Sequence, residues 1–252
     1  MDLGLEGKVA VVTGGSDGLG LATVKRLAAE GAKVVACARR EDHLKARLAE
    51  IPGETLAVRA DVSDAGDCAG LIGAAVAAFG GVDIIVNNAG ASAASKLEAL
   101  SDEGWEADFQ LKVMGAARLC RLAVPHLRAR GGGSIVNASI GGGKAPTAGA
   151  LPTSVMRAAG LNLTKSLANE YAAENIRVNA ICIVFIKSAQ WERRGGANGP
   201  GAIYEDFGRR VPLGRVGEAE DYADLVAFLV SARATYITGT AVNLDGGLCP
   251  VL

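Results

Sequence analysis

The segment TGGSDGLG at residues 13–20 has the residue types and the spacing of a turn that binds a diphosphate. Its spaced glycines are Gly14, Gly18 and Gly20. They let the backbone turn sharply and let a phosphate approach it closely, while the helix that follows offers N–H groups and the positive end of its dipole. An apolar strand at 9–12 precedes the turn and a helical pattern at 19–29 follows it, which favours a dinucleotide site over an ordinary turn.

The residues after the second predicted strand bear on the choice of cofactor. An acidic residue at that point would accept hydrogen bonds from a ribose 2′-hydroxyl. This chain has no carboxylate there and instead places Arg39 and Arg40 after Ala38. Because guanidinium groups pair well with phosphate, the segment favours NADP(H), with NAD(H) as the alternative. The competing interpretation is that both arginines are solvated surface charges.

The elements that must position these residues follow a regular alternation. Apolar runs of strand length lie at 9–12, 34–37, 55–60, 84–86, 134–138, 178–183 and 241–244. Segments with helical spacing lie at 19–29, 64–79, 102–128, 153–173 and 218–231. Such alternation predicts a parallel sheet of about seven strands with helices on both faces, which is the doubly wound α/β Rossmann fold.

Domain organisation follows from the absence of repeats and of linker-like changes in composition. Residues 1–252 are predicted to form a single nucleotide-binding domain. The glycine-rich segment RRGGANGPG at 193–201 follows the carboxyl end of a strand, where ligands bind in open α/β sheets. A mobile substrate loop is therefore predicted near residues 187–210.

Composition and charge argue against several classes of partner. The formal net charge of −1 gives no attraction to nucleic acid or to an anionic membrane. No apolar run is long enough to span a bilayer and residues 1–9 show no targeting pattern, so a cytoplasmic protein is expected. Five scattered cysteines indicate reduced thiols, and two histidines argue against a histidine-rich metal site. The expected partner is a small-molecule substrate.

Several motifs in order resemble those of the short-chain dehydrogenase/reductase family over essentially the whole chain. TGGSDGLG at 13–20 is similar to the family's TGxxxGxG turn, and NNAG at 87–90 to the motif after its fourth strand. GSIVNAS at 133–139, LTKSLANEYAAENIRVNAI at 163–181 and YITGTAVNLDGG at 236–247 resemble later strands, the long helix and the tail. The resemblance implies a nicotinamide cofactor and hydride transfer involving a small carbonyl or alcohol substrate.

The resemblance also implies which residues contact the cofactor. Asp61, in ADV at 60–62, would contact the adenine, and Ile186 and Ser188 would contact the nicotinamide carboxamide. Ile183 and Val184 replace the Pro-Gly pair that the family has after its sixth strand. The full implied set is Gly14, Ser16, Gly18, Leu19, Gly20, Arg39, Arg40, Asp61, Val62, Asn88, Ala89, Gly90, Arg157, Ile186 and Ser188.

None of the family's catalytic Ser, Tyr, Lys and Asn is present in direct register. AAGLNLTKSLA at 158–168 sets the register of the long helix, which places Thr153 at the Tyr position and Arg157 at the Lys position. The Ser position falls on Ile140, so Ser139 replaces it only if the loop has shifted by one residue. The Asn position, counted from Trp105, falls on Lys112. The candidate catalytic residues are therefore Ser139, Thr153, Arg157 and Lys112.

These replacements change what the site can do. Threonine is shorter than tyrosine and its hydroxyl does not ionise in a useful range, so Thr153 can donate a hydrogen bond but is a poor proton donor. A positioned acid typically contributes about 10²–10⁴ in rate. Arg157 can bond ribose hydroxyls through its planar fork, but it stays protonated and cannot pass a proton on.

Three functions remain open at this stage. In the first, the chain is an NADP(H)-dependent oxidoreductase, and Lys112, Lys144, Lys187 or a water supplies the proton. Lys112 would lie near Arg157, whose like charge would lower the pKa of Lys112, unless Lys112 turns toward solvent. In the second, the same scaffold performs redox-neutral chemistry as an isomerase, lyase or cyclase. In the third, the chain is a non-catalytic dinucleotide-binding protein.

Other residues have structural interpretations that compete with functional ones. Tyr204 and Trp191 flank the predicted loop and would pack it or line the pocket, while Asp108 is expected to make structural bonds. The resemblance implies a homotetramer or homodimer, with contacts from 102–128, 153–173 and the tail at 248–252.

Overall fold

A seven-stranded, fully parallel sheet forms the centre of the computed structural model, which describes residues 1–194 and 199–252. The strands are β1 (Val9–Thr13), β2 (Lys33–Ala38), β3 (Thr55–Arg59), β4 (Ile84–Asn87), β5 (Gly133–Ile140), β6 (Ile176–Ile183) and β7 (Ala241–Leu244). Their order in the sheet is β3-β2-β1-β4-β5-β6-β7. The prediction of a doubly wound α/β fold with seven strands is confirmed.

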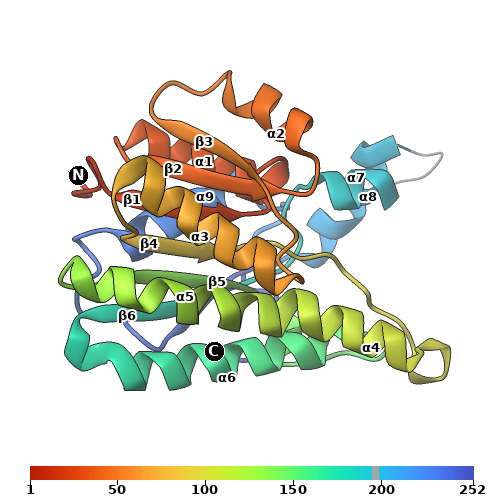
Figure 1. Cartoon of the computed structure of the whole chain (residues 1–252). Helices are drawn as coiled ribbons and strands as arrows, with labels where there is room; N and C mark the ends of the chain where they lie inside the picture. The colour runs from red at the N-terminus through yellow and green to blue at the C-terminus, as the bar shows by residue number, and fades with distance from the viewer. Residues whose placement is uncertain (195–198) are drawn as a thin grey trace.

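Helices cover both faces of this sheet (Figure 1). One face packs against α1 (Gly18–Ala29), α2 (Glu41–Leu48) and α9 (Ala219–Val230). The other face packs against α3 (Ala65–Phe79), α5 (Gly115–Ala129) and α6 (Thr153–Tyr171). Strands β1 and β4 are buried along their whole length, which explains why they read as continuous apolar runs in the sequence.

The segment that was predicted as one helix over 102–128 contains a local change of winding. It begins as α4 (Asp102–Phe109), passes through a π-helical turn, η2 (Gln110–Met114), and continues as α5. Ser101 caps α4, because its hydroxyl accepts a hydrogen bond from the Gly104 amide at 3.3 Å. A π-turn adds one residue to a helix and rotates the side chains around it, and such turns are frequent at functional sites.

The carboxyl ends of the parallel strands meet at one edge of the sheet, and the connections that follow β1, β4, β5 and β6 gather there. After β6 the chain forms α7 (Ala189–Arg194) and α8 (Gly199–Arg210), which lie together beyond one end of the sheet (Figure 1). The predicted mobile loop near 187–210 therefore contains two helices. Its central residues, 195–198, lie outside the described part of the chain.

Three single-turn 3₁₀ helices complete the regular structure of the described residues: η1 (Leu97–Ala99), η3 (Gly141–Gly143) and η4 (Ala172–Glu174). The same described ranges contain no helix that is both long enough and apolar enough to cross a bilayer.

Candidate functional site

The glycine-rich turn between β1 and α1 has the backbone geometry that its sequence predicts. Gly14 and Gly18 have φ values of +67° and +52°, which other residue types rarely adopt. A Cβ atom on Gly20 would collide with the carbonyl oxygen of Gly14. The turn is thus closed so tightly that only glycine fits at its far end, and its backbone stays open to a ligand.

The amino end of α1 has no side chain to cap it. Asp17 occupies the N-cap position, yet its carboxylate accepts no hydrogen bond from the first turn, and that turn carries no acidic residue. Free N–H groups and the positive helix dipole at this point suit an anion such as a diphosphate. The predicted contacts Ser16 and Leu19 flank this end, with Leu19 half-buried against the core.

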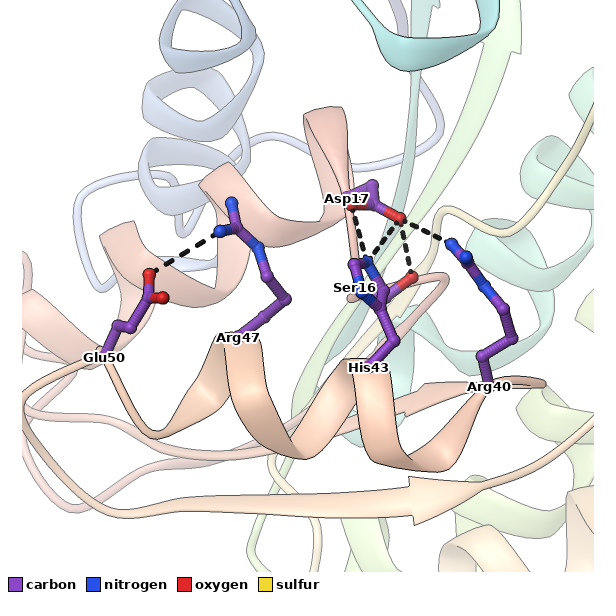
Figure 2. A network of polar contacts seen from close by, with 6 residues as sticks. All are labelled: Ser16, Asp17, Arg40, His43, Arg47 and Glu50. Carbon is purple, nitrogen blue, oxygen red and sulfur yellow. Dashed lines mark hydrogen bonds and ion pairs between the residues drawn. The ribbon is translucent and has the colours of Figure 1, made fainter.

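The carboxylate of Asp17 is turned toward α2 instead, as Figure 2 shows. It accepts hydrogen bonds from Arg40 Nη2 at 3.2 Å and from Ser16 Oγ at 3.3 Å. It also lies 2.9 Å from Nε2 of His43. Arg39 and Arg40 are both exposed, which fits a phosphate contact and solvated surface charges equally well.

The turn after β4 is tied directly to the end of β1. The Thr13 hydroxyl accepts hydrogen bonds from the amides of Asn88 and Ala89, each at 2.9 Å. The Asn88 side chain donates to the Thr13 carbonyl, also at 2.9 Å. A Cβ on Gly14 would lie 3.1 Å from the Cα of Ala89. The two predicted cofactor turns are therefore in contact, with little room for larger side chains.

The predicted adenine contact Asp61 is held in its ionised form. Its carboxylate accepts hydrogen bonds from the hydroxyl and the amide of Ser63, at 2.6 Å and 3.0 Å. These bonds, helped by the charges of Arg39 and Arg59, lower the pKa of Asp61 below its usual value. Val62 is buried and packs against Gly115 of α5.

Ile186 and Ser188 lie where α7 approaches the glycine-rich turn. Ile186 is buried, whereas Ser188 is half-buried and its Cβ would lie 3.7 Å from a Cβ on Gly18. Tyr204 of α8 fixes this segment, because its hydroxyl accepts from the Ser188 amide at 3.1 Å and donates to the Ser188 carbonyl at 3.2 Å. The packing role of Tyr204 is thus the one that its contacts support.

An aromatic cluster joins α7 and α8 to the end of β6. The rings of Phe185 and Phe207 stack with centroids 4.0 Å apart, and Trp191 contacts both edge to face. Gln190 accepts a hydrogen bond from the Ser92 amide at 3.0 Å, which ties α7 to the turn after β4. These helices therefore cover the edge of the sheet where a substrate would enter.

Thr153 and Lys112, which are 41 residues apart in the chain, are in direct contact. Thr153 is the first residue of α6, and its Oγ1 accepts hydrogen bonds from Lys112 Nζ at 3.2 Å and from the Ala93 amide at 3.0 Å. The Lys112 side chain is only 1% exposed. The alternative that Lys112 turns toward solvent is wrong, because the π-turn directs it into the interior.

Asp108, for which structural bonds were expected, is the charge partner of Lys112. The two side chains form a buried ion pair one helical turn apart. Burial lowers the pKa of Lys112, Asp108 opposes that shift, and the charge of Arg157 adds to it. The spacing of Asp108 and Lys112 in the sequence was the available signal, since oppositely charged residues four apart meet on a helix.

Arg157 spans the ends of two strands. Its Nη1 donates to the Ala138 carbonyl of β5 at 2.6 Å, and a Cβ on Gly90 would lie 2.5 Å from its Nη2. A side chain at residue 90 would therefore require the Arg157 guanidinium to shift. Burial lowers the pKa of Arg157. The usual pKa of a guanidinium is so high that the group nevertheless remains charged.

A small, partly open pocket of about 20 Å³ lies beside Lys112 and Arg157. Its polar lining consists of Asn87, Lys112, Asn137 and Arg157, with Thr13 at its edge. Among the residues that the structure describes, Oδ1 of Asn87 is buried without a hydrogen-bond partner. A cavity of this size holds about one water molecule, and the unpaired oxygen gives such a water an anchor beside Lys112.

Ser139 lies in a regular part of the sheet. The pairing of β5 with β6 is unbroken from Gly133 to Ile140, so no bulge within β5 changes the register of Ser139. Side chains alternate across a strand, so Ser139 and Ile140 point to opposite faces. Ser139 is buried and its hydroxyl donates to the Arg157 carbonyl at 3.4 Å. Its contacts are those of a structural residue that supports α6.

The two other candidate proton donors are engaged elsewhere. Lys144 donates to the Ala241 carbonyl and to Asn243 Oδ1, both at 2.7 Å, which ties it to β7. Lys187 pairs with Glu218 at 2.5 Å. Of the three lysines considered, only Lys112 contacts Thr153. Within the described ranges, no group of three metal-binding side chains is found.

Comparisons with known proteins agree with this fold. A family model described as enoyl-(acyl carrier protein) reductase matches residues 14–249. The chain is 36% identical to dehydrogenase/reductase SDR family member 4 of Oryctolagus cuniculus, over 96% of this chain and 94% of that protein. It is 33% identical to the 3-oxoacyl-[acyl-carrier-protein] reductase FabG of Thermotoga maritima, over 97% and 98% of the two chains.

Solved structures give the same result. L-sorbose reductase from Gluconobacter frateurii, in complex with NADPH and L-sorbose, superposes with a TM-score of 0.93 at 36% identity, over 100% of both chains. Levodione reductase superposes with a TM-score of 0.92 at 30% identity, over 98% of this chain and 99% of that one. The chain belongs to the short-chain dehydrogenase/reductase family of oxidoreductases, with a fold that binds a nicotinamide dinucleotide.

Proposed function

We propose that this protein is an NADP(H)-dependent oxidoreductase that interconverts a small carbonyl compound and its alcohol, with Thr153, Lys112 and Arg157 as its working polar groups. The observation that carries the proposal is the hydrogen bond from the buried Lys112 ammonium to the Thr153 hydroxyl. It restores a proton source at the position where a tyrosine is absent.

The bonds that Thr153 accepts determine what its hydroxyl can do. A hydroxyl has two lone pairs and one hydrogen. The Ala93 amide and Lys112 Nζ occupy both lone pairs of the Thr153 oxygen. The hydroxyl hydrogen is therefore the part of the group that is still free to form a hydrogen bond. Thr153 is therefore a hydrogen-bond donor toward a substrate oxygen, and the cation behind it makes that donation stronger.

Lys112 supplies the charge and the proton. In a buried site, an ammonium next to a developing alkoxide stabilises it more than water would. The pKa of Lys112 is lowered mainly by burial, which makes the ammonium a better acid than an exposed lysine. A proton then passes from Nζ through the Thr153 hydroxyl to the substrate oxygen. Asp108 keeps the resulting amine in position and favours its reprotonation.

Arg157 has an electrostatic role in this scheme. Its guanidinium is fixed by the Ala138 carbonyl and lies against Gly90, beside the turn after β4. It offers a permanent positive charge and N–H donors to ribose hydroxyls, and it does not exchange protons.

The residues present fit the cofactor. The uncapped amino end of α1 and the glycine turn would bind its diphosphate, Asp61 its adenosine, and Arg39 with Arg40 its 2′-phosphate. When bound, the reduced nicotinamide supplies the hydride. The similar L-sorbose reductase was solved with NADPH and a small sugar, which supports both the NADP(H) preference and a small polar substrate.

Turnover tests this proposal directly. NADPH consumption is followed at 340 nm against a panel of small ketones, diketones and ketoses that includes L-sorbose. Thr153→Val removes the hydroxyl at nearly constant volume and is expected to lower kcat about 100-fold, with NADPH affinity unchanged. Thr55→Val in β3 is the matched control and should leave kcat unchanged. Equal kcat in Thr153→Val and the unmodified chain would refute the role of Thr153.

One observation favours a second candidate, a non-catalytic dinucleotide-binding protein. Thr153 is only 5% exposed, and the segment at 93–95 covers it through the Ala93 bond and a bridge between Ser95 and Leu151. If NADPH binds but no compound in the panel consumes it, this candidate is preferred. Conversion of an enolisable substrate without any change in cofactor oxidation would instead show a redox-neutral enzyme.

We also propose that the chain assembles as a homotetramer or homodimer in the cytoplasm. Exposed apolar side chains at Leu97, Val155 and Leu252 lie in or beside the segments expected to form the contacts. Light scattering of the purified chain measures the assembly, and a monomeric mass would overturn it.

A further inference from the structure

Asp17 and His43 have no part in the proposed reaction, and together with Arg40 they form a cluster of polar contacts (Figure 2). Asp17 comes from the turn before α1, and the other two residues come from the start of α2. Asp17 Oδ2 lies 3.2 Å from Arg40 Nη2, and Oδ1 lies 2.9 Å from His43 Nε2. One carboxylate is thus shared by two donors from the neighbouring helix.

The orientation of Asp17 departs from the usual behaviour of this residue type. Aspartate at an N-cap normally accepts a hydrogen bond from the first helical turn. Asp64, at the N-cap of α3, does so and accepts from the Asp67 amide at 2.8 Å. Asp17 has the extended backbone that capping requires, with φ −150° and ψ 163°, yet makes no such bond. Arg40 and His43 together direct its carboxylate away from α1.

The cluster lies at the adenosine end of the proposed cofactor site. The amide of Gly15, two residues before Asp17, donates to the Cys37 carbonyl near the end of β2 at 3.0 Å. In this fold the residue that follows the second strand faces the 2′ position of the adenosine ribose. Asp17, Arg40 and His43 therefore surround the place where NADP(H) carries a phosphate and NAD(H) carries a hydroxyl.

The charges in the cluster have opposite effects on the binding of such a phosphate, because Arg40 would attract it and Asp17 would repel it. Arg39 makes no ion pair within the described ranges and is free to pair with the phosphate, whereas Arg40 is already paired with Asp17. A 2′-phosphate would compete with Asp17 for Arg40 and His43, and would be repelled by the carboxylate itself. A 2′-hydroxyl would meet neither effect and could donate to Asp17.

We propose that Asp17 determines cofactor specificity as an internal competitor of the 2′-phosphate, and that Arg40 and His43 leave Asp17 to bind the phosphate when NADP(H) enters. This inference rests on the proposed function, since it assigns the adenosine end of the same site. Asp17 limits the preference for NADP(H), and the chain also accepts NAD(H).

Calorimetric titration with two cofactor fragments tests this role without the nicotinamide. The probes are 2′,5′-ADP, which carries the 2′-phosphate, and 5′-ADP, which lacks it. Asp17→Asn removes the charge and keeps the shape, and is expected to tighten 2′,5′-ADP binding about tenfold, equal to about 1.4 kcal/mol. Binding of 5′-ADP should change less than about twofold. His43→Gln should weaken 2′,5′-ADP alone, by about threefold.

Glu50→Gln provides the matched control. Glu50 lies just beyond α2 and pairs with Arg47 at 3.6 Å, so its substitution removes one negative charge outside the cluster (Figure 2). It should leave the ratio of the two dissociation constants unchanged. A thermal unfolding curve of each variant checks that it is folded.

The outcomes separate this inference from the proposed function. If both fragments bind but Asp17→Asn leaves their ratio unchanged or weakens 2′,5′-ADP, Asp17 is not a competitor and the inference fails alone. If the unmodified chain binds neither fragment, nor NADPH, nor NADH, both proposals fail. If Asp17→Asn changes the ratio of the NADPH and NADH dissociation constants as it changes the ratio for the two fragments, the inference is supported for the whole cofactor.

Discussion

The turn that would bind the cofactor diphosphate and the group of polar side chains around Thr153 are built in different ways. The turn before α1 is made of backbone: three glycines and a helix end without a capping side chain. The polar group consists of side chains from distant segments, namely Asp108, Lys112, Thr153 and Arg157. A site made of backbone is specified by a short local motif, whereas a site made of side chains can be exchanged residue by residue on the same scaffold.

The largest effect expected is the loss of the backbone site. Gly20→Ala places a Cβ against the Gly14 carbonyl, so the turn must open, and affinity for NADPH and NADH should both fall more than about 100-fold. Titration of cofactor fluorescence measures this. Gly73→Ala in α3 is the matched control, because a Cβ there meets nothing within 4 Å. Retained affinity in Gly20→Ala would show that the turn is less constrained than its geometry indicates.

The next effect concerns the side-chain site and its stability. Lys112→Met leaves the buried carboxylate of Asp108 without its partner and should lower the free energy of unfolding by about 3–5 kcal/mol. The double variant Asp108→Asn, Lys112→Met removes both charges and should recover most of that loss. Urea denaturation measures both. Equal stability of the two variants would mean that the ion pair is not the relevant contact.

The pH dependence of turnover tests the protonation state of Lys112. Lys112 acts as the acid in its charged form, which is present below its pKa, and burial places that pKa below the usual lysine value. For carbonyl reduction, kcat should therefore be constant at lower pH and fall about tenfold per pH unit above the pKa of Lys112. The double variant should retain a low kcat without this decline. The same decline in the double variant would assign the proton to another group.

The smallest effect is expected at Ser139. Its hydroxyl makes one long bond to the Arg157 carbonyl, so Ser139→Ala should change stability by about 1 kcal/mol and kcat less than about twofold. Steady-state rates and a denaturation curve check both values. A large loss of kcat with normal stability would place Ser139 in contact with the substrate after all.

The contrast between the two sites also explains which sequence-based predictions succeeded. Strand and helix positions follow from apolar periodicity, and the predicted strand at 84–86 differs from β4 by one residue. The helix predicted over 102–128 is present, but the π-turn within it was not foreseen, because no residue pattern marks such a turn. The orientation of Lys112 could not be predicted for the same reason.

Two further expectations depended on contacts that the sequence alone does not define. A catalytic role for Ser139 depends on a one-residue shift of the loop after β5, and within β5 itself the pairing with β6 is unbroken. Lys144 and Lys187 were candidates by residue type, yet their partners at β7 and at Glu218 come from segments far along the chain.

The amino-acid sequence by itself determined the doubly wound fold and the glycine turn, because these depend on local pattern and residue identity. Only the tertiary structure decided which polar groups meet: Lys112 with Thr153 across 41 residues, and Asp17 with His43 across 26. Side-chain direction depends on helix winding and on packing against distant segments, and neither is encoded in the spacing of a single motif.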